Sequence, residues 1–124
     1  MSEFLQLFFY LAAFHAFADF ALQTDWMYAA KSHRTQTGAE KVEYGLPLWP
    51  LVLGSHALIH GGGVALLTGS ILLGALEAVS HAAIDYLKSD EKFGVYTDQG
   101  LHIVCKAAWA VAALSSGLGA GTGA

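Results

Sequence analysis

The sequence predicts an all-α fold, a polytopic transmembrane bundle of about four helices. Three observations support this prediction. The chain of 124 residues is 55% hydrophobic and only 13% charged, whereas ordinary soluble domains are about 25% charged. Its apolar residues gather in four stretches of roughly membrane-spanning length. The ionisable residues inside those stretches recur at helical spacing. We expect residues 1–124 to form a single membrane-embedded domain.

The four apolar stretches differ in length. Residues 4–22 form the first stretch and residues 48–68 the second. As a helix the second would be about 31 Å long, which matches a hydrocarbon core of about 30 Å. Residues 71–87 form a shorter third stretch, and residues 101–118 form the fourth. Because so few residues separate the second stretch from the third, these two are expected to form a tight helical hairpin.

The distribution of basic residues predicts the orientation of the helices. Lys31, Arg34 and Lys41 lie between the first two stretches, and Lys88 and Lys92 lie between the last two. With four spans these two loops face the same side of the membrane. The positive-inside rule makes that side cytoplasmic, so both termini are predicted to be outside.

The apolar stretches also carry ionisable residues four positions apart. These residues are His15 and Asp19; His56 and His60; Glu77, His81 and Asp85; and Asp98 and His102. Residues at i and i+4 share one face of a helix. An Asp at the centre of a spanning helix costs roughly 2.5–3.5 kcal/mol on insertion scales, so these groups are expected to face inward and partner one another. The predicted orientation places all four sets in the cytoplasmic half of the helix bundle. We therefore predict that they form one shared site.

The residue types in this predicted site indicate a metal centre. Imidazole and carboxylate groups together are typical ligands of zinc, iron or manganese. We predict a divalent metal ion, with zinc as the first choice. The six candidate ligands are His15, Asp19, His56, His60, His81 and Asp85. The three candidate catalytic residues are Glu77 or Asp98 as the general base, and His102 as a further ligand or a proton shuttle.

The rest of the chain limits the alternatives. A formal net charge of −4 is not that of a protein with a basic surface for binding nucleic acid. The one cysteine, Cys105, excludes an intrachain disulfide. Residues 23–47 are polar and are expected to form a loop with a short interfacial helix, in which His33 is solvated. The lipid bilayer is the predicted partner. The sequence does not decide whether the protein forms a homo-oligomer.

Four sequence blocks indicate a known family. They are HAFADFALQTDWM at residues 15–27, HALIH at 56–60, EAVSHAAIDYLK at 77–88 and DQGLH at 98–102. These blocks resemble the domain-of-unknown-function 3307 family of small bacterial and phage integral membrane proteins. The resemblance covers roughly residues 5–109 and implies a multi-pass protein of the bacterial inner membrane, with no established activity. A looser similarity to membrane-bound metal-dependent hydrolases is an analogy.

Our leading functional hypothesis is a membrane-embedded, metal-dependent hydrolase. It would act on a lipid or lipid-linked substrate at the cytoplasmic leaflet, because the predicted site lies near the lipid head groups. One alternative is an ion or proton transporter, or a transporter subunit, that uses a His and carboxylate relay. A third is a phage or bacterial membrane-interaction protein whose polar pairs only stabilise helix assembly.

Overall fold

The computed structural model describes residues 2–116, and this part of the chain is mainly helical. The elements in chain order are α1 (Glu3–Ala16), the π-helix η1 (Phe17–Ala21), α2 (Asp25–Ala30), α3 (Gln36–Ala39), β1 (Lys41–Glu43), β2 (Leu46–Pro47), α4 (Trp49–Thr68), α5 (Ile71–Ser89) and α6 (Val95–Ser115). The prediction of a mainly helical chain is confirmed, whereas the two short strands were not predicted. Residues 117 and 118, at the end of the predicted fourth stretch, lie outside the described residues.

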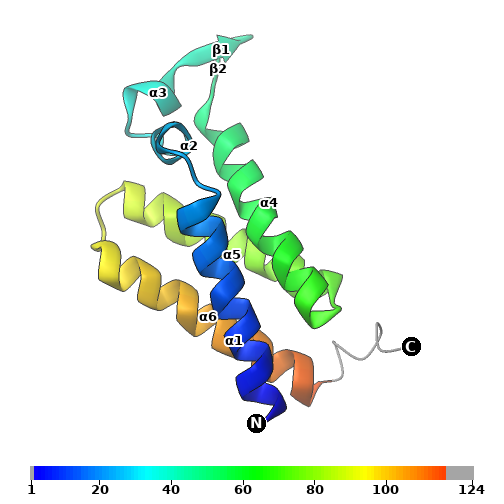
Figure 1. Ribbon diagram of the computed structural model, residues 1–124. Helices are drawn as coiled ribbons and strands as arrows, with labels where there is room; N and C mark the ends of the chain where they lie inside the picture. Colours follow the sequence, from blue (N-terminus) through cyan, green and yellow to red (C-terminus); the bar gives the residue numbers. More distant parts are fainter. Residues whose placement is uncertain (1, 117–124) are drawn as a thin grey trace.

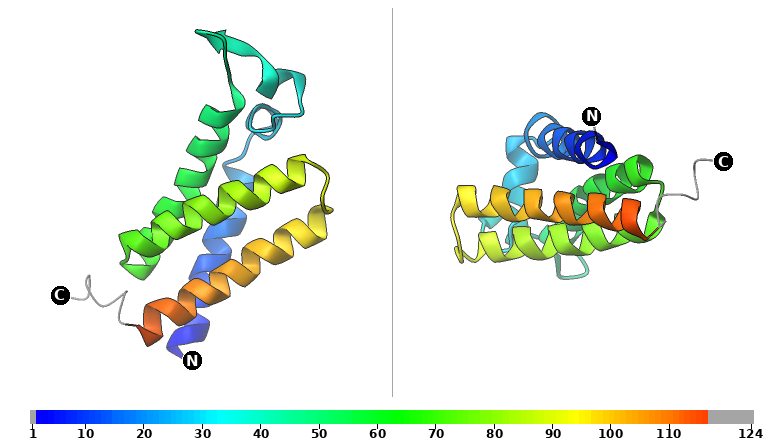
Figure 2. Two further views of the ribbon diagram at one scale, coloured as in Figure 1. Left: turned by 180° about the vertical axis from the view of Figure 1, so that it is seen from behind. Right: turned by 90° about the horizontal axis from the view of Figure 1, so that it is seen from below.

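The four long helical segments are α1 with η1, α4, α5 and α6. They pack around one interior (Figures 1 and 2). The segment formed by α1 and η1 contacts α4 and α6, and α5 contacts the same two helices from the other side. The segment from α2 to β2 covers the end of the molecule far from the N-terminus, and the α5–α6 connection lies toward that end (Figure 1). The two lysine-containing loops therefore gather away from the N-terminus.

Two of the long helical segments are long and apolar enough to cross a membrane, judged by length and composition. They are Glu3–Ala21 and Trp49–Thr68. Helices α5 and α6 are of similar length but are less apolar, because each carries several charged side chains. Crossing by all four helices therefore stays a prediction.

The interior and the surface have an unusual distribution of side chains. Among residues 2–116, seven of the ten largest fully buried side chains are ionisable: five histidines, Glu77 and Lys106. Large apolar side chains point outward instead; Leu66 is 87% exposed and Ile71 is 84% exposed. A protein folded in water normally buries its largest apolar residues and leaves Lys and Glu outside.

The buried interior has two levels. Its apolar level consists of Leu11, Val64, Leu73, Ala110 and Ala113. Along every long helix these residues lie on the side of the ionisable residues that is away from the lysine-containing loops. We call the buried ionisable side chains the ionisable level; they are those of His15, Asp19, His56, His60, Glu77, His81, Asp85, Asp98, His102 and Lys106. The ionisable level therefore occupies the half of the interior nearer the α2–β2 segment.

The tight hairpin predicted between the second and third stretches is confirmed. Helix α4 ends at Gly69, which adopts the left-handed conformation with φ 75° that suits a glycine C-cap. Two other glycines let the helices approach closely: a Cβ on Gly61 would lie 2.5 Å from the carbonyl oxygen of Gly74. This close approach brings His60 of α4 against His81 of α5, whose ring centroids are 3.6 Å apart.

The segment predicted as a loop with a short helix is more ordered than expected. It contains α2, α3 and the antiparallel pair β1 and β2. Tyr44 and Gly45 connect the two strands with φ values of 50° and 73°. Two successive positive φ angles are typical of a two-residue hairpin turn.

Candidate metal centre

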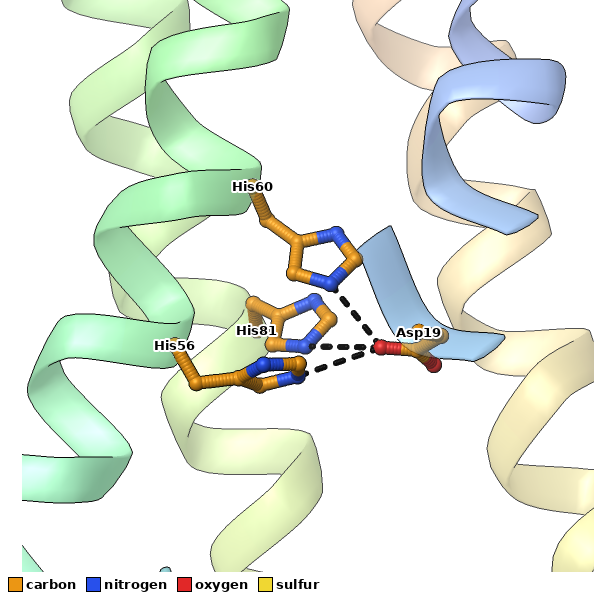
Figure 3. A group of neighbouring side chains, drawn as sticks. All are labelled: Asp19, His56, His60 and His81. Carbon is orange, nitrogen blue, oxygen red and sulfur yellow. Dashed lines mark hydrogen bonds and ion pairs between the residues drawn. The ribbon is translucent and has the colours of Figure 1, made fainter. Parts of the chain in front are cut away.

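Three imidazole rings converge on a single carboxylate oxygen in the ionisable level (Figure 3). The Nε2 atoms of His60, His56 and His81 lie 2.8, 3.1 and 3.7 Å from Oδ1 of Asp19. The four residues come from η1, α4 and α5, and all four are buried. Side chains from helices that are distant in sequence thus lie close together around Asp19 Oδ1.

The spacing of these atoms fits a bound metal ion. Two ligands at about 2.0–2.1 Å from one tetrahedral zinc ion lie about 3.3 Å from each other. The observed distances of 2.8 to 3.7 Å bracket that value. Three imidazoles and one carboxylate are moreover the ligand types that zinc commonly takes in proteins. Asp19, His56, His60 and His81 can therefore hold one ion together.

His81 is the least satisfied member of this group. Its side chain is fully buried, and neither of its ring nitrogens makes a hydrogen bond within residues 2–116. Its Nε2 lies 3.4 Å from Asp85 Oδ2, and its Nδ1 lies 3.4 Å from Glu77 Oε1. Leaving a buried polar group unpaired costs about 1–3 kcal/mol. A metal ion bound at Nε2 would remove part of this cost.

The π-helix η1 positions Asp19. Its characteristic i to i+5 bond is made by the Leu22 N–H, which donates to the Phe17 carbonyl oxygen at 3.0 Å. Short π-helical segments are rare and occur frequently at functional sites. The widened turn still keeps Asp19 near His15, with 3.4 Å between Oδ2 and Nε2. The predicted inward placement of both residues is thus seen in the structure, although the local helix type was not predicted.

A second group of ligand types adjoins the first. His102 Nε2 lies 3.1 Å from Asp85 Oδ1 and 3.4 Å from Asp98 Oδ1. His102 also joins His15 and His81 in a group of three imidazoles whose nitrogens lie close together. These sets and the first one together contain every predicted site residue except Glu77.

Glu77 lies one turn deeper along α5 and has different partners. Lys106 Nζ donates to its Oε1 at 2.6 Å, and Trp109 Nε1 donates to its Oε2 at 2.6 Å. From this position Glu77 faces the Nδ1 side of His81, as carboxylates behind metal-binding histidines often do. Its predicted role as general base stays a prediction. The contacts favour the other candidate, Asp98, whose buried Oδ1 has no hydrogen bond in the described chain.

Two residues of the site, Gln99 and Lys31, were not predicted from the sequence. The Gln99 amide donates to Asp19 Oδ2 and to Asp98 Oδ2, both at 3.0 Å, and its Oε1 lies 2.8 Å from His15 Nε2. Lys31 Nζ donates to Asp85 Oδ2 at 2.6 Å. The position of Gln99 inside the DQGLH block was a usable signal. For Lys31 the sequence predicts only a contribution to orientation.

A smaller polar cluster ties the α2–α3 segment to the end of α5. His33 Nε2 and Arg34 Nε lie 2.7 and 2.8 Å from Asp90 Oδ1. His33 also stacks on Tyr86, with ring centroids 4.1 Å apart. The prediction of a solvated His33 was therefore wrong, because this ring is held between two elements. The Arg34 and His33 contacts keep the pKa of Asp90 below its usual range.

A cleft of about 690 Å³ leads to this site. It opens between η1, α2 and the facing ends of α5 and α6. Asp19, Asp85 and Asp98 reach it from the buried site, and Lys31 and Lys88 line it nearer the α2–β2 segment. Small molecules can therefore approach the carboxylates from the end of the molecule where the lysine-containing loops gather.

Fold and site together define a mainly helical protein with a buried cluster of histidines and carboxylates. The chain matches the model of a family described as a protein of unknown function, DUF3307, over residues 7–119. It belongs to this family, so the resemblance seen in the sequence blocks is confirmed. No curated protein and no solved structure matches the chain significantly.

Proposed function

We propose that this protein is a multi-pass membrane protein with about four spanning helices, and that it is a metal-dependent hydrolase. Its substrate would be a lipid or lipid-linked molecule at the cytoplasmic leaflet of a bacterial inner membrane. The observation behind this proposal is the convergence of three imidazole Nε2 atoms on the Asp19 carboxylate. This group is buried, yet it adjoins a cleft that a substrate can enter.

The distribution of side chains supports the membrane part of the proposal. Exposed leucines, phenylalanines, valines and isoleucines occur on all four long helical segments. Exposing so many large apolar side chains is unfavourable in water. A lipid environment removes that penalty, and it also explains why ionisable groups gather inside.

The residues around the cleft support hydrolysis. A divalent ion in this site would polarise the substrate and acidify water. Asp98 would accept a proton from the attacking water, since it lines the cleft and its Oδ1 has no hydrogen-bond partner in residues 2–116. The water oxygen would join the substrate as the bond to the leaving group breaks. The leaving group would take up the proton from Asp98 by way of His102, whose Nε2 lies 3.4 Å from Asp98 Oδ1.

The two alternative functions fit the described interior less well. A transporter needs a polar path across the membrane, but the apolar level that contains Leu11, Val64 and Leu73 closes the far half. Polar pairs that only stabilise helix assembly should satisfy one another. His81 fits that expectation less well, because its buried nitrogens lie 3.4 Å from carboxylate oxygens and make no hydrogen bond in the described chain.

Metal analysis of the purified full chain tests the proposal. We expect about one zinc ion per chain, removable by a chelator with a loss of thermal stability. His60→Asn should bind less zinc, while the control His33→Asn should bind as much as the unchanged protein. Absence of bound metal and of any metal-dependent stabilisation would overturn the metal-dependent mechanism.

A further inference from the structure

The cleft contains cationic groups that the proposed hydrolysis does not use. Lys31 Nζ and Lys88 Nζ lie 5.7 and 5.3 Å from the ring centroid of Tyr28, so both ammonium groups border one ring. All three side chains line the cleft. Each ammonium group carries N–H donors whose hydrogen bonds an anion in the cleft could accept.

The two lysines differ in how firmly they are held. Lys31 forms a short bond of 2.6 Å with Asp85, which fixes its ammonium group. In the described chain Lys88 Nζ lies 3.8 Å from Asp98 Oδ2, beyond hydrogen-bond distance. Its side chain is 22% exposed. Lys88 therefore retains donors that can turn toward a ligand in the cleft.

A bound divalent ion would offset the negative charge of the site. Four buried carboxylates belong to Asp19, Glu77, Asp85 and Asp98. The three ammonium groups within ion-pair distance of them belong to Lys31, Lys88 and Lys106. Asp25, Glu91 and Arg34 also line the cleft. With neutral imidazoles all these groups sum to two net negative charges, which a divalent ion would cancel. The ion and Lys88 would then offer positive charge to an anionic ligand in the cleft.

The rim of the cleft continues onto the apolar exterior. Phe20 and Val95 line the cleft and are 68% and 52% exposed. A ligand whose charged end lies between the lysines can therefore extend an apolar chain along this surface. The combination of cations inside and apolar side chains at the rim matches an amphiphile with an anionic head.

We propose that the cleft binds the phosphate group of a phosphorylated lipid, with Lys88 donating to the phosphate oxygens and Lys31 holding Asp85 beside them. This inference rests on the proposed function, because it names the substrate class of the same site. Phosphate is favoured because its oxygens can accept charge-assisted hydrogen bonds from Lys88 and also suit a divalent ion.

Calorimetric titration of the full chain in detergent tests this inference. The probe is a hydrolysis-resistant phosphonate analogue of dioctanoyl phosphatidic acid, added to zinc-supplemented protein. A charge-assisted hydrogen bond contributes enough that Lys88→Gln should weaken binding about tenfold. The matched control is Lys92→Gln, which removes an equal charge from an exposed position outside the cleft and should leave the affinity unchanged.

Two further probes test whether the cleft recognises the phosphate group, the acyl chains or both. Dioctanoylglycerol lacks the phosphate and should bind much more weakly; equal binding would overturn the inference. Glycerol 3-phosphate has the phosphate without acyl chains. Weaker binding of glycerol 3-phosphate supports a lipid ligand, whereas equal binding would assign the cleft to soluble phosphate esters and overturn the lipid part.

A zinc titration of the same variants separates this inference from the proposed function. Lys88→Gln should keep the zinc affinity of the unchanged protein. Zinc binding without Lys88-dependent phosphonate binding would overturn the phosphate site alone. Lys88-dependent phosphonate binding without zinc binding would overturn the metal-dependent function and leave the phosphate site supported.

Discussion

Glu77 and His81 are one helical turn apart on α5, and they show two kinds of buried polarity. Their side chains are 1% and 0% exposed. Both carboxylate oxygens of Glu77 are hydrogen-bonded, to Lys106 and to Trp109. His81 makes no hydrogen bond in the described chain. Burial of an ionisable group is therefore not by itself a sign of function; a buried group left without a hydrogen bond is the stronger sign.

The two residues also belong to different surroundings. Glu77 adjoins the apolar level and links α5 to α6 through Lys106, so its contacts belong to the framework of the protein. His81 faces Asp19 and Asp85, which line the cleft. The comparison predicts that changes near Glu77 act mainly on stability, whereas changes at His81 act mainly on metal binding.

The largest expected effect is on stability, from Lys106→Met. Removing one member of a buried ion pair leaves the other charge uncompensated and typically costs about 3–5 kcal/mol. The free energy of unfolding, measured in mixed micelles, should fall by that order. The double variant Glu77→Gln with Lys106→Met should recover most of the loss. A double variant no more stable than Lys106→Met would show that the Glu77 charge is not the cause.

The second effect is on zinc affinity, and it distinguishes the role of His81 from the structural role of Glu77 and Lys106. His81→Ala should reduce zinc affinity more than about 100-fold, since even loss of a partner behind a ligand costs 10–100-fold. Competition with a chromophoric chelator measures this affinity. The free energy of unfolding of the metal-free protein should change little by comparison with Lys106→Met. Undiminished zinc binding by His81→Ala would remove this imidazole from the ligand set.

A third change tests whether helix spacing brings the imidazoles together. Gly61→Ala would place a Cβ 2.5 Å from the Gly74 carbonyl oxygen, and such overpacking typically costs about 1–3 kcal/mol. We expect a lower melting temperature and weaker zinc binding, because α4 must move away from α5. Gly62→Ala is the control, since a Cβ there meets no atom of the described neighbouring residues within 4 Å. Equal behaviour of the two variants would contradict this account.

The smallest effect concerns Asp90, outside both levels of the interior. Its lowered pKa means that the native state prefers the carboxylate more than the unfolded chain does. This stabilisation is present above the usual Asp pKa of about 3.9 and is lost as the pH falls through the lower native value. Protection of the α2–α3 segment from proteolysis should decline over that acidic range. In Asp90→Asn protection should be weaker at neutral pH and nearly independent of pH.

The sequence by itself determined the positions of the long helices and most residues of the candidate site. Apolar stretches of spanning length mark where helices form, and the i to i+4 spacing of ionisable residues shows which face turns inward. The last helix was the exception. It begins at Val95, not at residue 101, because its first turn carries polar side chains that hydropathy alone does not assign to a helix.

The tertiary structure decided how the inward groups are paired. Glu77 takes Lys106 and Trp109, and Lys31 reaches Asp85 from 54 positions away. Periodicity defines the face of one helix, but it contains no information on the rotation and height of one helix against another. Those quantities depend on close packing such as that of Gly61 on Gly74. They determine which buried groups are hydrogen-bonded and which, like His81, make no hydrogen bond within residues 2–116.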